Sequence, residues 1–136
     1  MAYAKTVRLD LPYEEAVPRV KEVFKQHGFG TLTEIDVRAT LQEKLGAEME
    51  PYLIIGACNP NLARRALDTE REIGLLLPCN VVVRAADGGG VIVDALDPSI
   101  MASVPGNADL APIAEEASRL VGEALNELAG VAASQR

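Results

Sequence analysis

Several residue types that build catalytic and metal sites are scarce in this chain. It contains no tryptophan, one histidine and two cysteines. Structural zinc sites take four cysteine or histidine ligands, so the composition excludes a zinc site built from thiolates alone. No apolar run approaches the roughly 20 residues of a membrane-spanning helix. Residues 1–6 include no apolar signal segment, so we expect a cytoplasmic protein with reduced thiols.

A surplus of basic charge is also lacking. Lysine and arginine total 13 and aspartate and glutamate total 20, which gives a net charge of −7 and an isoelectric point near 4.7. Nucleic-acid phosphates and anionic membrane surfaces both attract basic proteins. We therefore expect neither a nucleic acid nor a membrane among the partners.

The chain does contain enough apolar residues to form a core. Its 136 residues are 49% hydrophobic and 24% charged, as in ordinary globular proteins. A chain of this length buries roughly two-thirds of the surface that it exposes when unfolded. We expect residues 1–136 to form a single domain that needs no disulfide or metal for stability.

Hydrophobic periodicity divides the chain into strands and helices. Short apolar or alternating runs predict strands at 3–9, 31–38, 52–58, 80–85 and 91–96. Helical spacing and capping residues predict helices at 14–27, at 40–45, from Asn59 onward and at 109–133, with 98–106 irregular. This order favours an α+β fold, a curved antiparallel sheet with the first and last helices against it. A parallel, doubly wound sheet is the alternative, because some strands alternate with helices.

The predicted strand 31–38 carries two acidic side chains on one face. Glu34 and Asp36 share that face with Arg38, while Thr33, Ile35 and Val37 share the other, as in a half-exposed strand. Paired carboxylates can share a proton or bind a hard cation, which makes Glu34 and Asp36 candidate ligand-binding residues. A solvated, salt-bridged strand surface is the alternative that we favour.

Two cysteine motifs, Cys58-Asn59-Pro60 and Pro78-Cys79-Asn80, each lie at the edge of an apolar run. If strands 52–58 and 80–85 are antiparallel neighbours, both thiols lie at the same end of the sheet. If the two strands are parallel, the thiols lie at opposite ends. Asn59 is typical of a helix N-cap and Pro60 of the first helical position, so the helix N-terminus predicts a lowered pKa for the Cys58 thiol.

Other soft or polar groups can join these thiols. Asn59 and Asn80 are candidate amide donors at the same spot, and Met101 is a candidate third soft metal ligand if its loop folds back. The set Cys58, Cys79 and Met101 suits Cu(I), and haem contact is conceivable. Free cysteines are most often inert core residues, and the alternation of strand 80–85 places Cys79 on the side of its buried valines. Inert thiols, soft-metal binding and thiol redox chemistry therefore stay open.

With these residues laid out, the chain resembles the prokaryotic family called domain of unknown function 302. The stretches that carry the resemblance are Gly28-Phe29-Gly30, residues 33–37, residues 51–60, residues 73–83, and Asp97-Pro98 with Met101. The resemblance covers roughly residues 3 to 130. It implies a fold like that of the TATA-box-binding protein, β-α-β(4)-α with added short helices, in which about five strands form a curved antiparallel sheet with helices on one face.

The same resemblance implies assembly as a dimer, and it supports the antiparallel arrangement in which Cys58 and Cys79 lie close together. It supplies no biochemical activity, and a fold name carries no function with it. We therefore expect a small homodimeric domain that binds a ligand or a partner, with no residue assigned to catalysis. The alternative is a soft-metal, cofactor or thiol redox protein that uses Cys58 and Cys79.

Overall fold

A computed structural model describes residues 2–134 of the chain, and side chains through residue 130. Its strands are β1 (Ala4–Leu9), β2 (Gly30–Asp36), β3 (Tyr52–Cys58), β4 (Cys79–Ala85) and β5 (Val91–Leu96). Its α-helices are α1 (Tyr13–Gln26), α2 (Val37–Leu45), α3 (Pro60–Thr69), α4 (Ile100–Ser103) and α5 (Ala111–Ser134). Two 3₁₀-helices, η1 (Arg71–Leu76) and η2 (Ala108–Leu110), complete the described elements.

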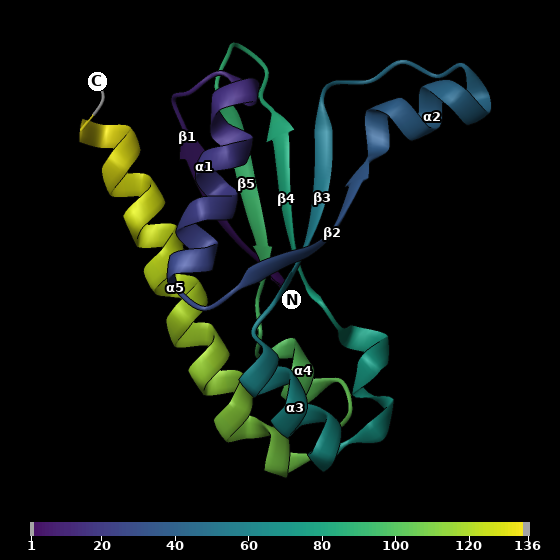
Figure 1. The fold of residues 1–136 in the computed structure, drawn as a ribbon, viewed down its shortest axis with the longest axis vertical. Coiled ribbons are helices and arrows are strands. Elements are labelled where there is room, and N and C mark those ends of the chain that lie inside the picture. The colour runs from purple at the N-terminus through teal and green to yellow at the C-terminus, as the bar shows by residue number, and fades with distance from the viewer. Residues whose placement is uncertain (1, 135–136) are drawn as a thin grey trace.

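The strands form one five-stranded sheet in the order β1-β5-β4-β3-β2, and every pairing is antiparallel. The helices α1 and α5 lie against one face of this sheet, whereas α3, α4 and η1 form a lobe beyond one end of it (Figure 1). The α+β prediction is confirmed. The parallel, doubly wound alternative is wrong, because no strand pairing in the described sheet is parallel.

Alternation along the strands explains which face the helices cover. Val91, Val93 and Ala95 of β5 are buried, while the residues between them are half-exposed. The inward-facing residues join α1 and the second half of α5 in the main core. A second cluster lies in the lobe and includes Leu62, Ile73 and Met101. Cys79 packs against both clusters, so it lies where the two cores meet.

Strand β2 differs most from its prediction. It ends at Asp36, whose side chain accepts a hydrogen bond from the backbone N–H of Ala39 at 2.9 Å, so Val37 and Arg38 start α2 instead of extending the strand. The half-exposed pattern is also wrong, because every residue of β2 after Gly30 is exposed. β2 pairs with β3 alone and forms, with α2, an arm that projects from the rest of the sheet (Figure 1).

Other boundaries shift by smaller amounts. The helix predicted at 40–45 begins three residues earlier, at the Asp36 cap. The segment predicted as irregular contains α4, and the long C-terminal helix begins at Ala111 after η2 rather than at residue 109. Strand β5 follows the prediction, and the turn that joins it to β4 contains Gly88, Gly89 and Gly90, all at positive φ.

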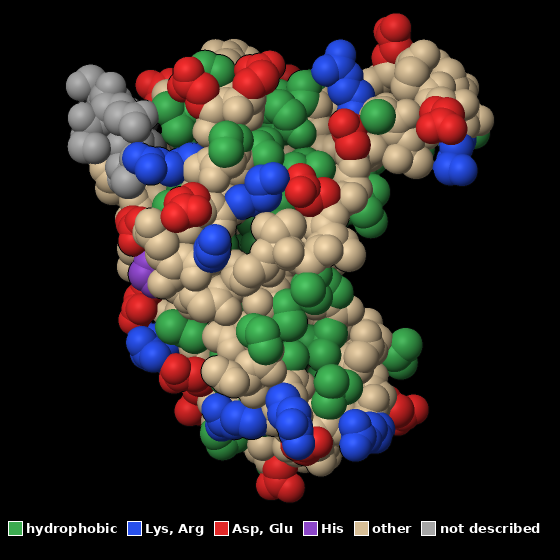
Figure 2. Space-filling view, in the orientation of Figure 1, with side chains coloured by type: hydrophobic (Ala, Val, Ile, Leu, Met, Phe, Trp, Pro, Cys, Tyr) green, Lys and Arg blue, Asp and Glu red, His purple; other side chains and the backbone are tan. Residues whose placement is uncertain are grey.

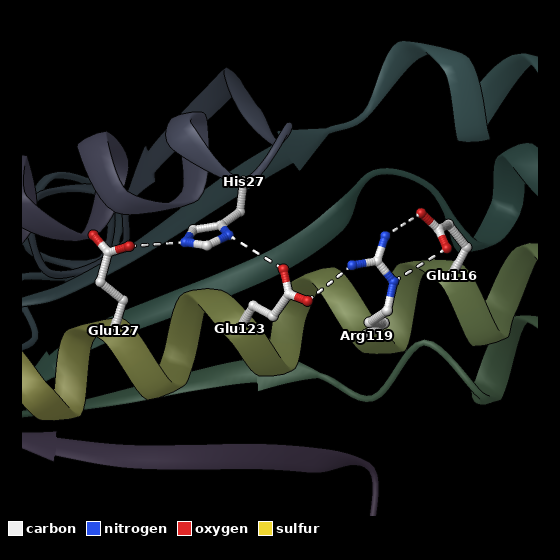
Figure 3. Close-up of polar contacts among 5 residues, drawn as sticks. All are labelled: His27, Glu116, Arg119, Glu123 and Glu127. Atoms are coloured by element: carbon white, nitrogen blue, oxygen red, sulfur yellow. Dashed lines mark hydrogen bonds and ion pairs between the residues drawn. The ribbon is translucent and has the colours of Figure 1, made fainter.

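A chain of polar contacts links α1 to α5 at the surface (Figure 3). His27, which caps the C-terminus of α1, places its Nε2 2.9 Å from Glu127 and its Nδ1 3.7 Å from Glu123. Arg119 continues the chain, with contacts of 2.8 Å to Glu123 and 2.6 Å to Glu116. Exposed ion pairs contribute about 0–1 kcal/mol each, so apolar packing holds these two helices together more than the charges do.

Candidate sulfur-lined site

The register of β3 and β4 sets the positions of both cysteines. Ala57 of β3 lies directly opposite Cys79, the first residue of β4, and Cys58 is the next residue along β3. The two thiols therefore lie at the same end of the sheet, next to the lobe. Both cysteines are free and half-buried.

Both cysteines line one small cavity between the sheet and the lobe. Its volume is about 20 Å³, and Met101 from α4 forms part of its wall. The other lining residues are Phe29, Ala57, Asn59, Leu62, Ala63, Leu77, Pro78, Ile113 and Ala117. Since a single water needs about 10–15 Å³ of such volume, the cavity accommodates one water or one ion but no organic cofactor of the size of haem.

Asn59 caps helix α3 at the point where the chain leaves this cavity. Its side-chain Oδ1 accepts a hydrogen bond from the backbone N–H of Leu62 at 3.1 Å, so Asn59 is the N-cap that the sequence predicts for α3. Its amide nitrogen lies close to Gly28, where an added Cβ would come within 2.9 Å of it. The amide of Asn59 is thus engaged in holding the turn after β3.

Burial dominates the electrostatics of the two thiols. It raises the pKa of the Cys58 thiol above its usual value. It also raises the pKa of Cys79, to about 11, with a further contribution from the neighbouring Cys58. The lowered pKa expected for Cys58 is wrong, because desolvation disfavours the thiolate and the Asn59 side chain already occupies an N–H group of the first turn of α3.

The remaining candidate residues lie elsewhere. Asn80 is exposed and lines a hollow of about 210 Å³ on the opposite face of the sheet, together with Tyr3 and Leu96, so it does not join the thiols. Glu34 pairs with Lys21 of α1 at 3.2 Å, and Asp36 caps α2. Each carboxylate therefore has its own structural partner. Within the described part of the chain, no three or more His, Cys, Asp or Glu residues gather to hold a metal ion.

Sequence reasoning missed a row of apolar side chains on the face of the sheet without helices. In the strand register Ile35 lies opposite Ile54, and Ile54 lies opposite Val82, so the row crosses β2, β3 and β4. Ile35 is 50% exposed, and the other two side chains are half-buried. Alternation predicts which face of its own strand each residue lies on. Only the pairing register shows that residues from three strands line up in a row.

Comparison with known proteins places this architecture in a family. Residues 5–128 match the family described as "Domain of unknown function DUF302". The chain belongs to the DUF302 family. This DUF302 chain is also similar to a solved structure, the crystal structure of an uncharacterized conserved DUF302 protein from Bacillus stearothermophilus. The two share 29% sequence identity and a TM-score of 0.85, over 93% of this chain and 98% of the other.

No curated protein matches this DUF302 chain. The described helices include none with both the length and the apolar character needed to cross a membrane. Family membership thus supports the fold and leaves the chemistry to be argued from the residues. In this DUF302 domain the sulfur-lined cavity offers two thiols and a thioether in apolar surroundings, a set of soft donors with no acidic residue in its wall.

Proposed function

We propose that this DUF302 domain is a small homodimeric binding domain without a catalytic role of its own, and that two copies associate through the helix-free face of the sheet. The observation that carries this proposal is the apolar row formed by Ile35, Ile54 and Val82. A sheet usually buries both faces when both are apolar, and here only one face has helices against it. A second copy would cover the other face.

The charged side chains beside the apolar row all have partners within the chain, and they carry no acidic surplus. Arg84 contacts Asp94 at 3.0 Å, and Thr6 donates a hydrogen bond to the other oxygen of Asp94 at 2.7 Å. The guanidinium of Arg8 donates to the backbone carbonyls of Asp87 and Gly89. Although the chain carries a net charge of −7, this face has no acidic surplus, so two copies can approach there without strong repulsion.

Figure 2 has the orientation of Figure 1, with α1 in front of the sheet. Acidic and basic side chains are scattered over this helix-bearing face, and apolar side chains gather over the lobe.

The size of the helix-free face is compatible with a dimer. Strands about 4.8 Å apart and about 3.3 Å per residue give a five-stranded face of roughly 20 by 24 Å. Two such faces cover about 1,000 Å² in plan, which reaches the minimum of about 1,000 Å² for a biological interface and lies below the roughly 1,200–2,000 Å² of stable ones.

The mass of the protein in solution tests this proposal. We expect light scattering after size-exclusion chromatography to give twice the monomer mass of 14.5 kDa. The substitution Val82→Glu places a charge in the apolar row and should yield a monomer with an unchanged circular dichroism spectrum. Leu75→Glu is the matched control, since Leu75 is 85% exposed on the lobe and the dimer should survive. A monomeric wild type, or a dimer that tolerates Val82→Glu, would contradict the proposal.

The sulfur-lined cavity favours a second candidate function, in which Cys58 and Cys79 hold a soft ligand or take part in thiol redox chemistry. Nucleophilic attack needs a thiolate, and the raised pKa values of both thiols disfavour that branch. The volume of about 20 Å³ disfavours an organic cofactor. An atom-sized soft ligand fits the volume, and a cation bound between the two sulfurs would stabilise the thiolates that burial alone disfavours. A cytoplasmic location belongs to this proposal, because thiols stay reduced there.

A further inference from the structure

Both cysteines of the chain line the same cavity. The sequence has two cysteines and three methionines; Cys58, Cys79 and Met101 line the cavity, whereas Met49 lies in a separate hollow beside α2. The three sulfur residues come from β3, β4 and α4, which are distant in the sequence. Their convergence is a property of the fold and not of a local motif.

The chemistry of the wall selects the kind of ion. Thiolate and thioether ligands prefer soft ions such as Cu(I), whereas carboxylate and carbonyl ligands prefer hard ones. The lining residues include no carboxylate and no imidazole, and the side-chain oxygen of Asn59 already accepts from Leu62. Zinc prefers four strong ligands in a tetrahedron, and the cavity supplies only two thiols and one weak thioether.

The chain can also reach and enclose an ion at this position. Cys58 is half-buried at the end of β3, so the wall of the cavity is partly open to solvent at this residue. Met101 is 4% exposed and belongs to the core of the lobe, so its part of the wall is closed to solvent. A volume of about 20 Å³ admits one ion. The stoichiometry that follows is one ion per chain.

We propose that Cys58, Cys79 and Met101 bind one Cu(I) ion per chain; this inference rests on the second candidate function and names its ligand. Binding replaces the two S–H bonds by two Cu–S bonds and releases two protons to solvent, while the thioether of Met101 donates a lone pair. The ion enters as Cu(I) and stays Cu(I), so no electron is transferred. The complex joins the sheet to the lobe through three sulfur atoms.

The test is an anaerobic titration of Cu(I) into the full chain, with bicinchoninate as a competing ligand. We expect the wild type to withdraw one equivalent of Cu(I), and Cys58→Ser to lower the affinity at least 100-fold. Met101→Leu keeps the side-chain volume and both thiols, so it should lower the affinity about tenfold while leaving the fold unchanged. Met49→Leu is the matched control and should bind as the wild type does.

Absence of Cu(I) binding by the wild type, or equal binding by Cys58→Ser, would overturn this inference. Equal binding by Met101→Leu would remove the thioether from the ligand set and overturn the three-sulfur site. A parallel treatment with hydrogen peroxide, read by mass, separates the inference from the function on which it rests. If Cu(I) is not bound but peroxide removes two hydrogens by joining Cys58 to Cys79, copper binding fails and a thiol function survives. If neither reaction occurs, both fail.

Discussion

The stability of this domain should fall in alkaline solution because of Cys79. Burial raises the pKa of this thiol from 9.0 to about 11 in the folded chain, whereas unfolding exposes the thiol to water. Between these two values the unfolded state has lost the proton and the folded state has kept it. Since the unfolded state then binds fewer protons, the free energy of unfolding decreases as the pH rises through this window.

The size of the effect follows from the two pKa values. At pH 8 both states keep the proton almost fully, and Cys79 contributes almost nothing to the pH dependence. At pH 10 the pKa difference of about two units costs about 1.3 kcal/mol of the free energy of unfolding. This loss is large enough to measure, because small domains are stable by only about 5–15 kcal/mol.

Urea unfolding between pH 8 and pH 10, with a phosphine reductant and a metal chelator present, measures this loss. Circular dichroism is the suitable signal, because the chain has no tryptophan. Cys79→Ala is the control variant: its overall stability will differ, but its decline between pH 8 and 10 should be smaller than that of the wild type by about 1.3 kcal/mol. Tyr13 and Cys58, whose pKa values are also raised by burial, titrate in both proteins, so the difference reports Cys79 together with its interaction with Cys58. Parallel declines would refute the argument.

Three further predictions test the surroundings of the cavity and of α5. An alanine Cβ at position 56 would overlap the Thr33 hydroxyl and lie 2.8 Å from a ring carbon of Pro78, so Gly56→Ala should cost about 1–3 kcal/mol in urea unfolding. Thr33→Ala in the same chain should recover part of that cost, and no recovery would contradict the close approach. Asn59→Ala removes the cap of α3 and should cost about 1 kcal/mol, whereas Asn59→Asp should cost much less. Arg119→Ala should change the free energy of unfolding by less than about 1 kcal/mol, because its ion pairs are exposed, and a larger loss would show that the surface charges hold α5 in place.

Sequence patterns predicted the elements that depend on local signals. Strand β5 was predicted with its observed bounds, because Val91, Val93 and Ala95 alternate with less buried residues. The α3 N-terminus was predicted at Asn59-Pro60, because a cap and a first-position proline act within one turn. Strand β2 was extended too far, since Val37 and Arg38 continue the alternation and only the capping bond of Asp36 ends the strand.

The sulfur-lined cavity was predictable only in part. The sequence analysis predicted that both thiols lie at the same end of the sheet if strands 52–58 and 80–85 are antiparallel neighbours. The observed pairing of β3 and β4 is antiparallel. The sign of the Cys58 pKa shift was not predictable, because it depends on how the folded chain buries the thiol, and part of the cavity wall, including Met101 and Ile113, comes from segments distant in the sequence. Desolvation outweighs the local effect of a helix N-terminus.

Hydrogen exchange of helix α2 can report whether another molecule binds to the arm. None of its residues is buried, and it is held by a cap at Asp36 and a left-handed turn at Gly46. Isolated helices shorter than about 12–15 residues are marginal in water, so the amide hydrogens of α2 should exchange with solvent among the fastest in the sheet-and-helix framework. Any molecule that docks against the arm would slow this exchange without altering the core. Deuterium uptake of this one peptide therefore reports binding even where the ligand is unidentified.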